Sequence, residues 1–281
     1  MAAALTGSGQ VRCLVRERSR AAKLERLGVE LRVGDVTEAP SLAGAGEGVD
    51  VAYYLVHAMA GGAGFEERER VAAGNFARMA KREGVGRVVY LGGLGQETES
   101  KHLRSRHETA RILAAEGPPL TYFRAAMVVG AGSESYRTLR YLVERLPAMI
   151  APAWLKTPTQ PIAIDDVTEF LVQAPGVAAS EGREIQIGGP DVLSYGEMLD
   201  RMAEVLGRRR RPRVPVPLLS PRLSSLWIGL VTPVDAGVAR PLVEGLSTPT
   251  VVTDPTGAAL FDVTPTPFVE ALQRARAEET G

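Results

Sequence analysis

The chain has 281 residues, of which 45% are apolar, and it carries 33 basic and 33 acidic side chains. This balance is typical of a globular protein and argues against general nucleic-acid binding. Cys13 is the only cysteine, which excludes an internal disulfide and suits a cytoplasmic protein, and we expect neither a signal peptide nor a metal site.

Strands and helices alternate through the first half of the chain. Apolar runs predict strands at residues 11–15, 29–35, 49–57, 85–93 and 120–130, and amphipathic or capped runs predict helices at 19–28, 65–84 and 102–117. The strands lack the alternation of a half-exposed sheet, so we expect a parallel sheet covered by helices on both faces. This pattern predicts the doubly wound, Rossmann-like α/β class, in which ligands bind at the carboxyl ends of the strands.

After residue 130 the rhythm changes. Helices are predicted at 135–147, at 194–207 with Ser194 as its cap, and from about residue 265, with extended segments at 157–167 and 183–189. We expect Asp165 or Asp166 to cap a helix that begins beside them. We interpret residues 1–150 as the sheet domain and 151–281 as a smaller, mostly helical lobe over a substrate cleft, with 157–189 adding strands to the core.

Two segments bear on membranes. Prolines and an arginine interrupt the apolar residues 214–234, which predicts a buried or groove-lining helix and no transmembrane segment. The basic residues 207–213 could make a peripheral contact with an acidic lipid surface, and the alternative interpretation is a helix end complemented by cations.

Six ordered segments together resemble one family. They are GDVTEAPSL, VDVAYYLVHAM, GRVVYLGGLG, HLRSRHETARIL, FRAAMVVGAGS and QPIAIDDV. The set resembles the atypical short-chain dehydrogenase/reductases, closest to the NAD(P)H-binding, NmrA-like proteins and the related accessory subunit of respiratory complex I. This resemblance implies a Rossmann-like domain that binds NADPH or NADH, with a small C-terminal lobe that closes over a small-molecule substrate.

The segment TGSG, residues 6–9, is not placed as a phosphate-binding loop. Such a loop joins a strand to the start of a helix, whereas this segment follows at most five residues and directly precedes the strand at 11–15. We interpret it as the end of a helix. The chain is then expected to lack the family's first strand and glycine-rich loop, which would weaken cofactor binding. Strands 11–15 and 29–35 would lose their link to the sheet or pair directly with 49–57.

Arg16 and Arg18 follow the first predicted strand. An acid at this place would hold a ribose 2′-hydroxyl, whereas an arginine suits a 2′-phosphate, so we expect NADP(H) more than NAD(H). The alternative interpretation is a solvated basic helix start.

The resemblance places further residues at the cofactor. Asp35 and Val36 would lie against the adenine, with a turn or capping role as the alternative for Asp35. The remaining cofactor positions implied by the resemblance are Val56, His57, Gly92, Arg106 and Ala125.

The wider superfamily uses a serine or threonine after the strand that here ends in Gly92, and then a Tyr-x-x-x-Lys pair on the next helix. His102 and Arg106 fall on the positions of that pair, and their spacing keeps both on one helix face. Histidine can transfer a proton, whereas arginine can bind a ribose but does not titrate. A His/Arg variant of the chemistry is one interpretation, and a solvated face with Lys101, Arg104 and His107 is the other.

Arg124, Tyr136 and Arg140 are candidate substrate contacts by their position. Our first hypothesis is an NAD(P)H-dependent oxidoreductase that acts on a small carbonyl or quinone substrate. The second is a non-catalytic NAD(P)H-binding sensor or assembly protein.

Overall fold

The computed structural model describes residues 1–56, 64–95, 101–145, 149–151, 153–210, 212–215 and 247–280. Its first-half elements are α1 (Ala2–Leu5), β1 (Arg12–Val15), α2 (Ala22–Glu25), β2 (Glu30–Val33), β3 (Val51–Tyr54), α3 (Phe65–Arg82), β4 (Arg87–Gly93), α4 (Lys101–Glu116) and β5 (Leu120–Ala125). The later elements are β6 (Val128–Val129), α5 (Glu134–Arg145), β7 (Met149–Ala151), β8 (Pro158–Thr159), β9 (Ile162–Ala163), α6 (Ile164–Gln173), β10 (Glu184–Ile187), β11 (Leu193–Ser194), α7 (Tyr195–Val205), β12 (Arg213–Pro215) and α10 (Phe268–Thr280). Short 3₁₀ helices lie between them, among them η2 (Ala39–Leu42) and η3 (Ala153–Lys156).

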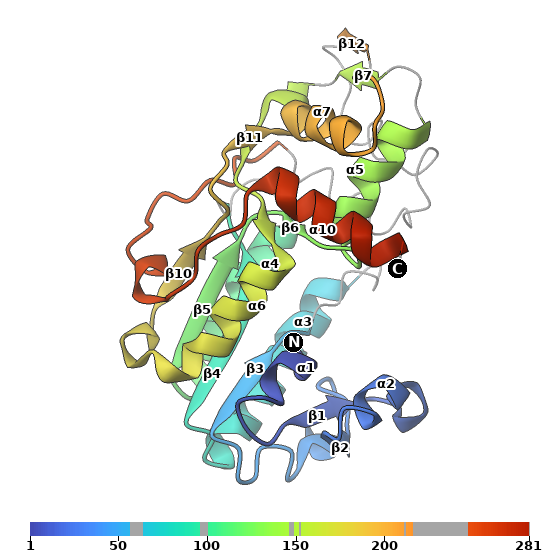
Figure 1. The fold of residues 1–281 in the computed structure, drawn as a ribbon. Coiled ribbons are helices and arrows are strands. Elements are labelled where there is room, and N and C mark those ends of the chain that lie inside the picture. The colour runs from blue at the N-terminus through green and yellow to red at the C-terminus, as the bar shows by residue number, and fades with distance from the viewer. Residues whose placement is uncertain are drawn as a thin grey trace.

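The main sheet has four strands in the order β10-β5-β4-β3, and every pair in it is parallel. Tyr54, Tyr90 and Tyr122 stand side by side across three of its strands. Helices lie in front of the sheet and behind it in Figure 1. The expected α/β class with a parallel, doubly covered sheet is therefore confirmed.

The two faces of the main sheet bury separate apolar clusters. On one face, Tyr54, Val88, Tyr90 and Tyr122 pack against α3 and α4. On the other, Val89, Phe123, Ile185 and Ile187 pack against α6 and the segment around Phe261. The alternation of faces along each strand explains why apolar residues fill the strands continuously, because both faces are buried.

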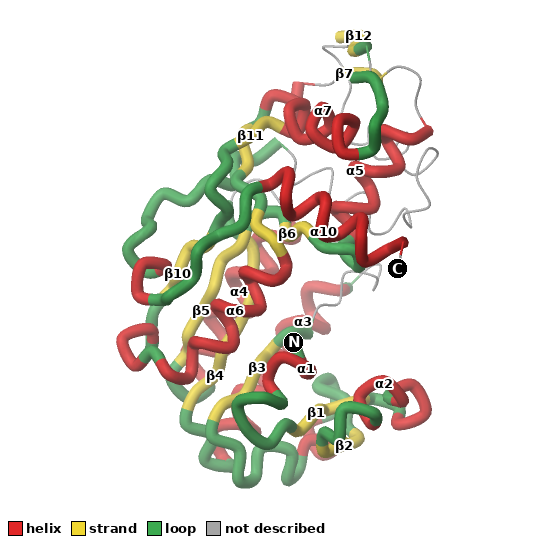
Figure 2. The backbone as a smooth tube through the Cα atoms, viewed as in Figure 1, coloured by secondary structure: helices red, strands yellow, loops and turns green. Residues whose placement is uncertain are grey.

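β1 and β2 form a separate two-stranded parallel sheet, seen beside β3 in Figure 2. Within the described residues, β1 pairs only with β2, and β3 pairs only with β4. The first of the two outcomes expected for these strands, loss of their link to the larger sheet, is thus the observed one. Leu14 and Val36 nevertheless pack against the cluster beneath α3, which holds the small sheet in place through side chains.

The residues TGSG follow a helix, as predicted. Thr6 is the C-terminal cap of α1, and its hydroxyl donates to the carbonyl of Ala3 at 2.8 Å. Gly7 and Gly9 have no positive φ and border open space, so neither is held against a neighbouring atom.

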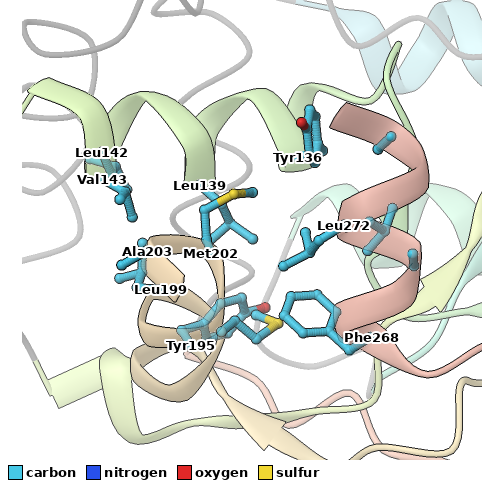
Figure 3. Packing of buried hydrophobic residues seen from close by; sticks show 14 of the residues in the cluster. Tyr136, Leu139, Leu142, Val143, Tyr195, Leu199, Met202, Ala203, Phe268 and Leu272 are labelled. Atoms are coloured by element: carbon cyan, nitrogen blue, oxygen red, sulfur yellow. The ribbon is translucent and has the colours of Figure 1, made fainter. Parts of the chain in front are cut away.

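A third apolar cluster joins the helices of the C-terminal half. Figure 3 shows side chains of α5, α7 and α10 meeting there, among them Leu139, Met202, Phe268 and Leu272. Ser194 begins α7 with a reciprocal capping box, since its hydroxyl accepts from the Glu197 amide while the Glu197 carboxylate accepts from the Ser194 amide. The predicted cap at Ser194 is confirmed.

The expected cap at the start of α6 is wrong. Ala163 occupies the N-cap position without a side-chain hydrogen bond. The buried Asp166 instead accepts hydrogen bonds from the amide and hydroxyl of Thr266, at 2.7 and 2.8 Å. Thr266, 100 residues away in the chain, thus binds the carboxylate that was expected to cap α6.

Candidate functional site

The candidate site is assembled from side chains at the carboxyl ends of β1 to β5. Parallel strands place these ends, with the following loops, where ligands of such sheets bind. The sequence-predicted residues of this region differ in exposure and in hydrogen-bond and ion-pair partners.

Arg16 directly follows β1 and is exposed. Within the described residues it has no hydrogen-bond or ion-pair partner. Arg18, by contrast, pairs with Glu25 at 3.0 Å on an exposed surface. Of the two arginines proposed to read a 2′-phosphate, the structure thus leaves Arg16 available and gives Arg18 a carboxylate.

Asp35 follows β2 and closes a tight turn. Its carboxylate accepts hydrogen bonds from the amide and the hydroxyl of Thr37, both at 2.8 Å. The Thr37 amide, then the Thr37 hydroxyl, and to a smaller extent the charge of Arg16 lower the pKa of Asp35 below its ordinary value. The turn role considered for Asp35 is therefore observed. The charge of Arg16, at the end of β1, also acts on the Asp35 carboxylate at the end of β2.

Val36, Val56 and His57 are the predicted cofactor residues that follow β2 and β3, and the structure describes the first two of them. Val36 is half-buried against the α3 cluster, and its carbonyl accepts from Asn75 of α3 at 3.0 Å. Val56 follows β3 and is 43% exposed. His57 lies outside the described residues.

His102 and Arg106 both lie on α4. The side chain of His102 is outside the described part of the structure, whereas Arg106 is only 6% exposed. Burial lowers the pKa of Arg106 to about 10, and the nearby hydroxyls of Tyr122 and Tyr54 oppose this shift. Of the residues named in the alternative of a solvated face, Arg104 is exposed as expected, whereas His107 is buried, so the alternative is wrong for His107. The side chain of Lys101 lies outside the described part of the structure.

Arg124 on β5 braces the end of β4. Its guanidinium donates to the carbonyls of Gly93 and Gly95, pairs with Glu184 of β10, and lies 3.2 Å from Nε2 of His107. Only 14% of its side chain is exposed. The structure thus joins Arg124 to the loop that follows β4 and to α4.

Tyr122 lies beneath Gly92. Its hydroxyl is 3.3 Å from Nδ1 of His107, and its ring stacks on Tyr90 with centroids 5.2 Å apart. A Cβ atom on Gly92 would lie 2.7 Å from Cε2 of Tyr122 and 2.8 Å from its hydroxyl. Sequence reasoning missed Tyr122 as a site residue and placed His107 only on a solvated face, since no local motif links a strand residue to a helix residue 15 positions earlier.

Ala125 ends β5 and is buried. Its carbonyl accepts from the amide of Leu94 at 2.8 Å, so the backbones after β4 and at the end of β5 are joined.

Tyr136 and Arg140 lie on α5, apart from these strand ends. Tyr136 is fully buried among α5 and α10 in Figure 3, and its hydroxyl donates to Glu279 at 3.2 Å. Arg140 pairs with the same carboxylate. Burial, with the charge of Glu279, raises the pKa of Tyr136 to about 12. Both candidates therefore contact Glu279 of α10. Among the described residues, neither side chain hydrogen-bonds to Arg124.

The described residues contain no cluster of histidine, cysteine and acidic side chains suited to a metal ion. Nor does this part of the chain include a helix long and apolar enough to cross a membrane.

Comparison with known proteins adds a family match and a fold match. Residues 1–129 match the family model described as NAD(P)H-binding. A search of curated proteins found no match. Among solved structures, an NADPH-dependent quinone oxidoreductase from Escherichia coli complexed with NADPH is similar at a TM-score of 0.76 and 16% identity, over 99% of this chain and 94% of that one.

Two further structures are similar over nearly their whole length. Triphenylmethane reductase from Citrobacter sp., complexed with NADP(H), gives a TM-score of 0.74 at 19% identity, covering 98% of this chain and 94% of that one. A nucleoside-diphosphate-sugar epimerase from Staphylococcus aureus gives 0.73 at 17% identity, covering 93% and 90%. At these identities the likeness establishes the Rossmann-like fold.

Proposed function

We propose that this chain is an NADP(H)-dependent oxidoreductase of a small carbonyl or quinone compound, and the match of its residues 1–129 to the family model described as NAD(P)H-binding supports the cofactor class. The resemblance to NAD(P)H-binding, atypical short-chain dehydrogenase/reductases is supported by the match of residues 1–129 to the NAD(P)H-binding family model and by the similar folds. Two of the similar structures are named as an NADPH-dependent quinone oxidoreductase and a triphenylmethane reductase, and both hold a phosphorylated dinucleotide. Their names support the reaction class proposed for this chain.

The proposed preference for NADP(H) over NAD(H) depends on the exposed Arg16. It follows β1, it has no partner within the described residues, and it lies close enough to Asp35 to affect the pKa of that carboxyl. A guanidinium in this position suits a 2′-phosphate, because it offers several donors in one plane and is always charged. The already paired Arg18 would supply a second, weaker positive charge.

The residues present fit parts of this cofactor. Arg16 suits the 2′-phosphate at the adenosine end. Asp35 at the adenine, and Gly92 and Ala125 as further cofactor positions, are implied by the resemblance. Among the described residues, β1 is followed by Arg16, Glu17 and the 3₁₀ helix Arg18–Arg20 without a glycine, so this strand end offers no glycine-rich cradle for the diphosphate.

The bound cofactor would supply the hydride, and the chain's own residues would orient it. In this proposal Val36, Val56 and His57 contact the adenosine and ribose, and Arg106 holds positive charge beneath them. His102 is the proposed proton donor, since an imidazole titrates near neutral pH. The α5–α7–α10 cluster is the proposed lobe over the substrate.

A titration of nicotinamide fluorescence with NADPH and with NADH tests the cofactor assignment. We expect NADPH to bind more tightly, and Arg16→Gln to weaken NADPH binding by about tenfold, which corresponds to ~1.4 kcal/mol, with little effect on NADH. Arg18→Gln is the matched control and should change the affinity by about twofold or less, because its charge is already paired at an exposed site. Equal affinity for the two cofactors, or an Arg16 variant that binds like wild type, would contradict the assignment.

Turnover of a quinone panel with NADPH tests the reaction. We expect reduction of 1,4-benzoquinone, and a loss of about 100-fold in kcat for His102→Ala if the imidazole donates a proton. Cofactor binding without turnover of any compound would favour the alternative function, a non-catalytic NAD(P)H-binding protein.

A further inference from the structure

One edge of β1 is without backbone hydrogen bonds in the described part of the chain. The carbonyl of Val15 accepts from the amide of Gly34 at 3.0 Å, so Val15 directs its backbone groups toward β2. Consecutive residues of a strand direct these groups to opposite sides, so those of Arg12 and Leu14 point away from β2. Among the described residues, the backbone groups of Arg12 and Leu14 have no hydrogen-bond partner.

β3 has an unpaired edge of the same kind. The carbonyl of Asp50 accepts from the amide of Arg87 at 3.3 Å, so Asp50 faces β4. By the same alternation, the backbone groups of Val51 and Tyr53 point away from β4, and within the described ranges they too are without a partner. Strand backbone groups are nearly always paired or solvated, so an edge of this kind can accept a further strand.

The unpaired edges of β1 and β3 lie next to each other. Leu14 and Tyr54 pack in the same apolar cluster beneath α3. The guanidinium of Arg12 donates to the carbonyls of Ala45 and Glu47, in the segment that leads into β3, at 3.2 and 2.7 Å. Figures 1 and 2 show β1 beside β3. The two strands thus share one helix layer and begin near each other, although no ladder joins them.

The side chains along these two strands are largely apolar and incompletely covered. Cys13, Leu14 and Val15 of β1 are half-buried, as are the first three residues of β3, whereas residues 88–90 of β4 are fully buried. The outer edge of β2 differs, because Glu30 and Arg32 of that strand are charged and exposed, as is common at edges that stay unpaired. The position between β1 and β3 therefore suits an apolar strand better than the outer edge of β2 does.

We propose that an extended apolar segment of another protein binds between β1 and β3 as a strand parallel to both. Addition of a strand to an open sheet edge is a general mode of peptide recognition, in which main-chain hydrogen bonds supply affinity. Here the segment would bond on both sides, to Arg12 and Leu14 of β1 and to Val51 and Tyr53 of β3. One of its faces would meet the α3 cluster and the other the α6 cluster, so apolar residues are required at consecutive positions. This interaction is independent of the proposed oxidoreductase reaction.

Amide hydrogen exchange measured by NMR, with and without the peptide acetyl-KTVVVVTK-amide, tests the proposal. Without peptide, we expect the amides of Leu14 and Tyr53 to exchange faster than those of Val15 and Tyr54, which face the partner strands. Saturating peptide should slow exchange at Leu14 and Tyr53 by about tenfold or more. Unchanged exchange at these two amides would overturn the proposal.

Two comparisons establish how and where the peptide binds. The same peptide with N-methylated valines at alternate positions lacks half of the donors and should not bind, so equal binding of both peptides would overturn strand addition. Slowed exchange at Leu31 and Val33 instead, on the outer edge of β2, would overturn the choice of position. Slow exchange at Leu14 and Tyr53 in a dimer without peptide would make a second copy of this chain the occupant and overturn the proposed partner.

A proline variant removes one donor from the proposed binding edge. Val51 is the first residue of β3, a place where proline is tolerated in strands, and its amide faces the open position. We expect Val51→Pro to raise the Kd of the fluorescein-labelled peptide about five- to tenfold, as for the loss of one hydrogen bond. Val33→Pro is the matched control, since its amide faces outward from β2 and its side chain is 58% exposed, and it should leave the Kd within about twofold. Equal weakening by both variants would contradict the proposed position, and if Val51→Pro does not fold, the N-methylated peptide still decides on wild type.

Discussion

Replacing Gly92 by alanine should destabilise the protein, although alanine is the smallest possible addition. The new Cβ would lie 2.7 Å from Cε2 of Tyr122, whereas ordinary contacts of this kind are 3.4 Å or longer. Tyr122 cannot withdraw easily, because it is buried, it stacks on Tyr90, and His107 holds its hydroxyl.

The magnitude follows from two opposing effects. Overpacking a well-packed core costs about 1–3 kcal/mol. Loss of glycine's freedom in the unfolded chain returns about 0.4–1 kcal/mol. We therefore expect Gly92→Ala to lower the free energy of unfolding by ~1–2 kcal/mol.

Urea unfolding of the two alanine variants at Gly92 and Gly132 measures this effect. Gly132 has no atom within 4 Å of an added Cβ and no positive φ, so Gly132→Ala should be neutral or slightly stabilising. Combining Gly92→Ala with Tyr122→Leu should relieve the clash and yield a coupling of about 0.5–3 kcal/mol between the two sites. A Gly92→Ala protein as stable as the Gly132→Ala control would refute the reasoning.

Two further predictions concern stability. Burial would raise the pKa of Glu83, but hydrogen bonds from Arg82 and from the amides of Gly46 and Gly44 hold that pKa below its ordinary value. The ionised Glu83 therefore stabilises the folded protein fully above the pKa it has in the unfolded chain. This stabilisation is lost as the pH falls through the lower pKa of the folded protein. Glu83→Gln should thus cost ~1–2 kcal/mol at pH 7, and its difference from wild type in urea unfolding should shrink below about pH 4; a difference that is constant with pH would contradict this. Asp166→Ala should lower the free energy of unfolding by ~1–3 kcal/mol, because the buried Thr266 amide would lose its hydrogen-bond acceptor. The control is Asp165→Ala at an exposed residue 3.8 Å from Arg274, which should cost about 0.5 kcal/mol or less. Equal changes in melting temperature for the two variants would count against the buried contact.

The local sequence determined the kinds and the order of the elements. Uninterrupted apolar runs predicted β3, β4 and β5 as strands buried on both faces, and both faces are indeed packed. The pattern that begins at Ser194 predicted the start of α7, because a capping box is closed by residues only three positions apart. Because TGSG directly precedes the predicted strand at 11–15, it was expected to end a helix, and Thr6 is indeed the C-cap of α1.

Partners remote in the chain were beyond such reasoning. Asp166 was expected to cap its own helix, yet Thr266 competes for it from the C-terminal segment. The position of Arg124 suggested a substrate contact, and the structure shows its donors distributed over β4, β10 and α4. A residue type limits which bonds a side chain can make, but it does not say which acceptor folding will bring within reach.

The amino-acid sequence by itself therefore determined a parallel, helix-covered sheet, since periodicity, capping and turn chemistry act within a few residues of one another. Only the tertiary structure decided that β1 and β2 pair apart from the main sheet, and that the hydroxyl of Tyr122 lies in the space beside Gly92. Both depend on distances between segments that are far apart along the chain, and those distances are set by the packing of the whole molecule.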